Sequence, residues 1–332
     1  MSRVWSGISA VLAAGIAGLG SAGAEPVGKW CSGVRIAAFA GGAEGSAFTT
    51  NVANGFSQAQ LDLGPTLNLG YFDWDPNKML AGIKDAVAGK VDGVIAYGLA
   101  GDAATDPLID KLFTGHAIFT VIHSALPRAE GRYLGQGLGF VGAPAYKLGE
   151  ALGTEAAVRA KLVKGDEVLV WGLRGWGHER GQRTTGVLDA LAKVGAKVTY
   201  QEIDAATNKD ASAGTVTFVG LLKKNPKFKL VVTDHGGLTA NAEVLAKAAG
   251  LGAGQVYFAG FDFSPEAAGA IADGYLGLVI DQEPYVMGYL SVLDICLAKK
   301  FGFIGLDVST VGAFIDKGNV EAMTGLAKQG VR

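Results

Sequence analysis

Short runs of hydrophobic residues alternate with longer segments of mixed hydrophobic and polar residues along most of the chain. The short runs are rich in Val, Ile and Phe and predict buried strands, whereas the mixed segments have the spacing of amphipathic helices. In the first part of the chain we predict strands at 34–39, 67–72, 93–97 and 117–122, and helices at 49–60, 76–88 and 107–113. Asp75 and Pro76 mark the start of one helix, as its N-cap and its first residue.

The same alternation then starts again. We predict strands at 167–171, 197–203, 230–233, 256–259 and 277–280, and helices at 145–161, 179–194, 213–224, 239–249 and 284–299. Strands that alternate with helices indicate parallel sheets with helices on both faces. The fold class is therefore α/β, with two doubly wound parallel-sheet lobes and a boundary in the Gly-rich segment 131–142. Ligands of such sheets bind beyond the carboxyl ends of the strands, so the residues that follow each strand are the ones to inspect.

Composition and charge narrow the functions that fit this fold. The chain has 332 residues, of which 49% are hydrophobic and 18% are charged, and its net charge is −2. This composition supports large cores and argues against disorder. A slightly acidic chain does not attract nucleic acid or an anionic membrane, so we expect neither as a partner.

The first 24 residues have the layout of a cleavable secretory signal. Arg3 is followed by the uncharged, apolar segment 4–19 and by small residues that end at Ala24. The alternative is a transmembrane anchor, but the apolar stretch is short and Gly-rich for a span of about 20 residues. No Cys directly follows the small residues, as it would in a lipoprotein. We therefore expect a periplasmic protein that is cleaved near Ala24 and carries no lipid anchor.

Several motifs suggest enzymes but lack the context that those enzymes need. Residues 137–142 match G-x-G-x-x-G, yet no clear strand leads into them. His235 precedes two glycines as in the oxyanion segment of esterases, but the chain contains no G-x-S-x-G. The four histidines are scattered, and His178 lacks the second histidine of a zinc-protease helix. We therefore expect no catalytic residue, no metal site and no cofactor.

Polar and aromatic residues recur at the ends of the predicted strands. Planar donors, carboxylate acceptors and aromatic rings together suit a sugar, which has hydroxyls around its edge and apolar C–H faces. Arg180 lies in the first turn of a helix, where the dipole disfavours a cation unless it has a partner. Asp234 and Asp262 could each be only a helix N-cap. The candidate ligand-binding residues are Ser46, Phe48, His123, Trp176, Arg180, Asp234, Asp262 and Gln282.

The order of these segments resembles the periplasmic sugar-binding proteins of ABC importers, the group that includes ribose-binding protein. The resemblance spans residues 34–316. The segment 46–48 with Gly55 is similar to the family's Asn-Pro-Phe-Phe…Gly, and 179–181 is similar to its Arg-Glu-Arg-Gly. Gly260-Phe261-Asp262 matches its Gly-Phe-Asp, and 280–282 matches its Ile-x-Gln. No single motif is specific, but their order through nearly the whole chain is.

The resemblance implies that Phe48 stacks on the sugar and that Arg180, Asp234, Asp262 and Gln282 hydrogen-bond its hydroxyls. Three positions depart from the pentose binders. Asp234 stands where they have Asn, His123-Ser124 stands where they have Asp-Arg, and Thr49 replaces the second Phe of the stacking pair. These departures keep a site for a polyol but make ribose itself doubtful.

The resemblance also implies a type I periplasmic-binding-protein fold, in which the chain crosses between lobes three times. We expect crossings near 137–142, 282–284 and 303–307. Residues 33–138 with 284–305 would form the N-terminal lobe, and residues 139–283 with 306–332 the C-terminal lobe.

The implied function is a solute-binding protein. It would capture a monosaccharide or related polyol in the inter-lobe cleft and deliver it, as a monomer, to an ABC permease in the inner membrane. One alternative is a sensory protein that presents a sugar or autoinducer-2 to a chemoreceptor or kinase. A second alternative is an exported enzyme.

The two cysteines leave one question open. Cys31 precedes the first strand and Cys296 lies late in the last long helix, and both are expected at the sheet edge away from the cleft. A bridge is possible in an oxidising compartment, but it needs Cα atoms within about 7 Å, which the sequence does not show.

Overall fold

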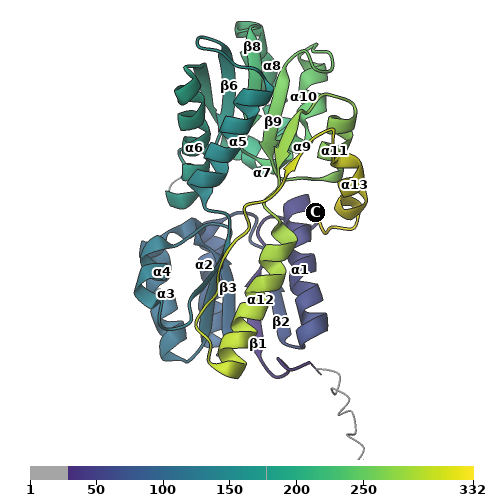
Figure 1. The fold of residues 1–332 in the computed structure, drawn as a ribbon. Coiled ribbons are helices and arrows are strands. Elements are labelled where there is room, and N and C mark those ends of the chain that lie inside the picture. Colours follow the sequence, from purple (N-terminus) through teal and green to yellow (C-terminus); the bar gives the residue numbers. More distant parts are fainter. Residues whose placement is uncertain (1–28, 177) are drawn as a thin grey trace, which may run out of the picture.

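The computed structural model describes residues 29–176 and 178–332, which form two lobes, each built on a six-stranded sheet (Figure 1). The predicted secretory signal lies outside the described residues. Within the described residues, no helix is both long enough and apolar enough to cross a membrane.

The first lobe contains a fully parallel sheet in the order β11-β5-β4-β3-β1-β2. Its strands are β1 (Arg35–Phe39), β2 (Thr66–Gly70), β3 (Gly93–Tyr97), β4 (Ile118–Ile122), β5 (Gly139–Gly142) and β11 (Asp307–Ser309). Its helices are α1 (Ala47–Leu63), α2 (Pro76–Ala88), the short 3-10 turn η1 (Gly98–Ala100), α3 (Asp102–Thr114), α4 (Pro127–Tyr133) and α12 (Pro284–Phe301).

The second lobe contains a sheet in the order β12-β10-β9-β8-β6-β7, parallel except for β12. Its strands are β6 (Glu167–Gly172), β7 (Lys197–Glu202), β8 (Phe228–Thr233), β9 (Tyr257–Phe261), β10 (Leu278–Ile280) and β12 (Phe314–Ile315). Its helices are α5 (Ala145–Arg159), α6 (His178–Val194), α7 (Ala205–Lys209), the 3-10 turn η2 (Ala211–Gly214), α8 (Thr215–Lys224), α9 (Gly236–Ala240), α10 (Ala242–Ala248), α11 (Pro265–Ala272) and α13 (Val320–Lys328).

The two parallel-sheet lobes confirm the predicted fold class, and the predicted strands lie within a few residues of the observed ones. Asp75 is the N-cap of α2, because its carboxylate accepts from the backbone N–H of Asn77 at 2.8 Å. Helix α3 differs from the prediction. It begins at Asp102, so Pro107 lies inside the helix instead of at its start.

Two lobe boundaries differ from those expected. Strand β5 pairs with β4, and β11 pairs with β5, so both strands belong to the first sheet. The chain therefore crosses between sheets after Gly142, between Ile280 and Pro284, and between Ser309 and Phe314. The Gly-rich segment that we interpreted as a crossing includes the buried strand β5. Position 139 in this strand is a glycine because a Cβ there would overlap the Asp294 carboxylate.

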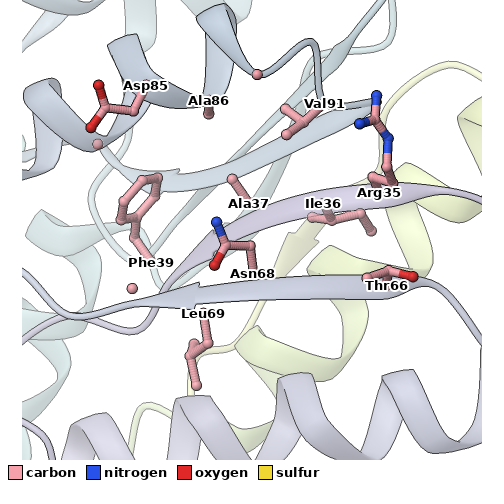
Figure 2. Close-up of a pocket in the computed structure, with 13 residues that line it drawn as sticks. Arg35, Ile36, Ala37, Phe39, Thr66, Asn68, Leu69, Asp85, Ala86 and Val91 are labelled. Atoms are coloured by element: carbon pink, nitrogen blue, oxygen red, sulfur yellow. The ribbon is translucent and has the colours of Figure 1, made fainter.

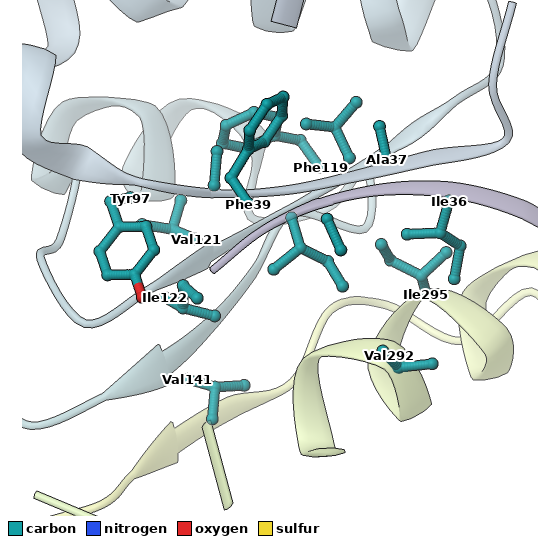
Figure 3. Packing of buried hydrophobic residues seen from close by; sticks show 14 of the residues in the cluster. Ile36, Ala37, Phe39, Tyr97, Phe119, Val121, Ile122, Val141, Val292 and Ile295 are labelled. Carbon is teal, nitrogen blue, oxygen red and sulfur yellow. The ribbon is translucent and has the colours of Figure 1, made fainter. Parts of the chain in front are cut away.

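Helix α12 returns from the second lobe to complete the core of the first. Its Val292 and Ile295 lie on the same side of the sheet as Ile36 of β1 and Val141 of β5 (Figure 3). The helix also crosses α1 closely. A Cβ on Gly55 would lie 2.1 Å from the carbonyl oxygen of Tyr285, and one on Gly288 would lie 2.2 Å from that of Val52. Two glycines thus allow the two backbones to approach.

A disulfide joins Cys31 to Cys296, with Cα atoms 5.5 Å apart. Both residues are fully buried in the first core. Cys31 precedes β1 and Cys296 lies in the second half of α12. The bridge therefore fastens the start of the sheet to the helix that returns from the other lobe, at the end of the strands opposite their carboxyl ends.

Candidate ligand-binding site

Aromatic side chains that follow or end three strands of the first lobe surround His123, which follows β4 at the carboxyl ends of the strands. The ring of Phe48, at the start of α1, lies 5.4 Å from the imidazole, and that of Tyr97, at the end of β3, lies 5.6 Å from it. Trp74 lies 5.7 Å from Phe48 and 5.5 Å from Tyr97, and Phe72 packs behind it. We call these five residues the aromatic cluster.

Glycine in the loop after β1 makes room for the indole of Trp74. A Cβ on Gly42 would lie 2.4 Å from Nε1 of Trp74, so only glycine lets the ring lie over this loop. Thr49, which replaces a second ring in the family's pattern, is fully buried, and its hydroxyl accepts from the backbone N–H of Gly42 at 2.9 Å. Trp74 therefore supplies the ring beside Phe48 that Thr49 does not.

Two arginines on α6 share one buried carboxylate of the second lobe. Asp234 follows β8 and is fully buried. Its Oδ1 accepts from Nε of Arg183 at 2.5 Å, and its Oδ2 accepts from Nη1 of Arg180 at 3.2 Å and from the hydroxyl of Thr184. Nη2 of Arg180 also donates to the Asp234 carbonyl at 2.9 Å. We call Arg180 and Arg183 the arginine pair.

The environment of Asp234 keeps the carboxylate ionised. Burial by itself would raise its pKa, but the charges of Arg180 and Arg183 and the hydroxyl of Thr184 bring the pKa below its usual value. Both carboxylate oxygens of Asp234 accept from protein donors, and its side chain is fully buried. Asp234 therefore positions the arginine pair. Its predicted direct contact with sugar hydroxyls has no support in this arrangement.

Asp262 and Gln282 extend the polar half of the site. Nε2 of Gln282 donates to Oδ1 of Asp262. Burial and the charge of Arg183 lower the pKa of Arg180, and the charges of Asp234 and Asp262 act against this lowering. Asp262 has a φ of 70°, in the left-handed region, which turns the chain sharply at the end of β9. The structure therefore places Gln282 in contact with Asp262, and Asp262 close enough to Arg180 for its charge to act on the guanidinium.

The aromatic cluster and the arginine pair both lie at the junction of the lobes, because α6 carries the arginine pair and contacts η1, which directly follows Tyr97. Burial lowers the pKa of His123 well below its ordinary value, and the charges of Arg183 and then Arg180 lower it further. The same causes lower the pKa of His235, the N-cap of α9, to about 4. Both imidazoles are therefore neutral at pH 7. Helix α6 also contacts η1 of the first lobe, so the lobes touch at this point.

Two predicted residues lie apart from these contacts, and four residues of the site were missed. Ser46 is exposed, and its hydroxyl donates to the carbonyl of Ala43, while Trp176 packs against the core of the second lobe. The missed residues are Phe72, Trp74, Tyr97 and Arg183. Phe72 and Tyr97 end predicted strands and Trp74 follows one, which was the available signal. Arg183 lies one helical turn after Arg180 and therefore on the same face of α6.

A separate hollow of about 420 Å³ lies within the first lobe, between α2 and strands β1 and β2 (Figure 2). The polar side chains shown around it are Arg35, Thr66, Asn68 and Asp85, and every lining residue belongs to the first lobe. It therefore does not provide the two-sided contact that a ligand between lobes requires.

Two doubly wound lobes, linked by three crossings and presenting complementary groups to each other, define a two-lobed ligand-binding protein. The family described as periplasmic binding protein domain matches residues 36–298, and the chain belongs to this family. The fold is that of type I periplasmic binding proteins. No curated protein that was compared matches the chain.

Solved structures of sugar-binding proteins share this fold along nearly their whole length. A carbohydrate transporter from Acidothermus cellulolyticus in complex with myo-inositol is 25% identical, with a TM-score of 0.75 over 90% of this chain and 99% of that one. A galactofuranose-binding protein is 15% identical, with a TM-score of 0.77 over 90% and 100%. A solute-binding protein from Agrobacterium radiobacter in complex with D-arabinose is 22% identical, with a TM-score of 0.73 over 90% and 99%.

Proposed function

We propose that this protein is an extracytoplasmic solute-binding protein that captures a monosaccharide or related polyol between its lobes and delivers it to an ABC permease. The observation that carries the proposal is the proximity of the aromatic cluster to the arginine pair. Family membership supports the class of protein. The cyclic polyol and the aldose named for two of the similar structures support the class of ligand.

The chemistry of the two halves matches the two kinds of surface on a sugar. Aromatic rings such as Phe48 and Trp74 cover apolar C–H faces, and guanidinium groups donate to hydroxyl and ring oxygens. The Asp262 carboxylate accepts from hydroxyl donors. A neutral His123 between rings and guanidiniums accepts or donates one hydrogen bond without adding charge. A neutral polyol therefore finds partners on both lobes at once.

Binding to both lobes also explains transport. A ligand that contacts the two lobes together favours the closed arrangement over the open one, by the free energy of the contacts made only when closed. Closure bends the three crossings that follow Gly142, Ile280 and Ser309. In our proposal, the closed pair of lobes is the form that the permease recognises. The protein itself binds its ligand without transforming it.

A ligand screen tests this function. Purified mature protein is heated with pentoses, hexoses, deoxysugars, inositols, linear polyols and autoinducer-2, and the unfolding temperature is recorded. A ligand present at 100 times its Kd adds about 2.7 kcal/mol of stability, which gives a readable shift. Calorimetry then measures Kd, and small-angle scattering compares the radius of gyration with and without the ligand.

The proposal predicts a micromolar or tighter sugar or polyol and a smaller radius of gyration when it is bound. Autoinducer-2 as the single ligand would favour the sensory alternative. Consumption of any sugar during incubation, followed by chromatography, would favour an exported enzyme. A panel with no stabilising compound contradicts the proposal.

A further inference from the structure

One donor of the arginine pair has no partner within the described residues. Nη1 of Arg183 is buried and unpaired, and the whole residue is only 3% exposed. Native proteins pair nearly all their buried polar groups, and a buried group of a charged side chain is especially costly to leave unpaired. A partner from outside the chain would resolve this cost.

The rest of the Arg183 side chain is fixed by the protein. Its Nε donates to Oδ1 of Asp234 at 2.5 Å, and its guanidinium lies over the ring of Phe261, 4.2 Å from the centroid. Asp234 follows β8 and Phe261 ends β9, so both anchors lie at the carboxyl edge of the second sheet. The guanidinium plane is therefore held before any ligand arrives, and little side-chain freedom is lost on binding.

The unpaired donor belongs to a residue near the start of α6, the helix that contacts η1 of the first lobe. Among the charged groups that act on His123 of the aromatic cluster, Arg183 has the largest effect, ahead of Arg180 on the same helix face. Arg180, in contrast, uses both of its terminal nitrogens on Asp234. Of the two guanidiniums, Arg183 is thus the one with a terminal nitrogen left for a ligand.

We propose that Arg183 is a ligand-binding and specificity-determining residue, whose unpaired Nη1 donates a hydrogen bond to an oxygen of the bound sugar or polyol. This inference rests on the proposed function and deepens it. Asp234 then acts as a positioning residue, which holds the fork of Arg183 through Nε and directs Nη1 to the ligand. The acceptor is a hydroxyl or ring oxygen at one position of the ligand, so loss of the Arg183 donor affects epimers of the ligand unequally.

Two substitutions separate this role from a purely structural one. Arg183→Met removes both the donor and the charge. Arg183→Lys keeps a cation beside Asp234, but a single ammonium on a flexible stem cannot reproduce the fork that reaches Asp234 and the ligand together. The matched control is Arg159→Met. Arg159 pairs with Glu155 and Asp316 in the same lobe, away from the arginine pair, so this variant loses an Arg–carboxylate contact outside the site.

The experiment uses the best ligand from the screen and two of its epimers. Calorimetry gives Kd for the wild type and the three variants, and circular dichroism gives the unfolding temperature of each without ligand. We expect a charged hydrogen bond to account for a roughly 10- to 100-fold loss of affinity in both Arg183 variants. We expect the loss to be smaller for one epimer, and the Arg159→Met variant to bind like the wild type.

The outcomes are distinguishable. Wild-type affinity in Arg183→Lys would show that Arg183 serves only as the counter-ion of Asp234, and this overturns the proposal while sugar binding stands. An equal loss for every epimer, matched by a large fall in unfolding temperature, would equally reduce Arg183 to a structural role. If the Met variant does not fold, the Lys variant still decides. If the wild type binds no sugar or polyol, the proposed function fails, and this inference fails with it.

Discussion

Reduction of the Cys31–Cys296 bridge gives the sharpest test of the fold. The bridge joins residues separated by 265 positions, and both partners are fully buried in the first lobe. Reducing the wild-type protein breaks the cross-link but keeps both sulfur atoms in the core. The comparison therefore isolates the cross-link from the packing loss that substitution of either cysteine would add.

The expected magnitude follows from the size of the loop. In the chain-entropy description, closing a loop of this length in the unfolded chain corresponds to about 5.6 kcal/mol at 25 °C. The second lobe lies inside the loop. If the second lobe stays folded while the first lobe unfolds, the flexible loop is roughly half as long. Because the loop-closure free energy depends only on the logarithm of the loop length, it is still about 5 kcal/mol. Measured bridges reach at most about 5 kcal/mol, so we expect reduction to lower the unfolding free energy by about 3 to 5 kcal/mol.

Urea unfolding with and without dithiothreitol measures this difference, and ligand affinity serves as the internal control. We expect no free thiols in the unfolded, unreduced protein and two after reduction. Affinity should stay unchanged, because the bridge lies at the opposite end of the strands from the aromatic cluster. Two free thiols before reduction would show that the bridge is absent, and a loss of stability below about 1 kcal/mol would show that the cross-link does not stabilise the fold.

Three further predictions concern single residues. Burial raises the pKa of Asp294 to about 6, so unfolding releases a proton between about pH 4 and 6, and this group's contribution to the free energy of unfolding falls as the pH rises through that window. In urea titrations, the free energy of unfolding of Asp294→Asn should exceed that of the wild type by a margin that grows by about 2 to 3 kcal/mol from pH 4 to 7, and a constant margin contradicts this. Arg332 lies 3.0 Å from the buried Asp281 carboxylate, so Arg332→Met should cost about 2 to 4 kcal/mol in urea unfolding, and a change within experimental error would show that Asp281 does not need its partner. Gly42→Ala should displace Trp74 and weaken ligand binding by roughly tenfold in calorimetry, whereas Gly220→Ala in α8, with open space around it, should leave binding unchanged; equal affinity in both variants would remove Trp74 from the site.

Local periodicity predicted most of the secondary structure, because burial of one face or one run of residues is set by neighbours in the sequence. It failed where tertiary packing replaces that signal. Strand β5 is Gly-rich, and it forms because β4 and β11 pair with it on both sides. Strands β11 and β12 have two or three residues each and carry too little pattern to be detected. The lobe boundaries were wrong for the same reason.

The two α/β lobes, and the polar and aromatic residues at the strand ends, could be predicted from the sequence, because alternating runs and strand-end positions are local properties. The division of those residues between roles depends on tertiary packing. Asp234 was expected to bind ligand, but its oxygens are occupied by the arginine pair, and Arg183 was unremarked until its neighbours were known. Trp74 and His123 are distant in sequence and meet through sheet order. Which donors remain unpaired depends on every contact around them, and those contacts exist only once the chain has packed.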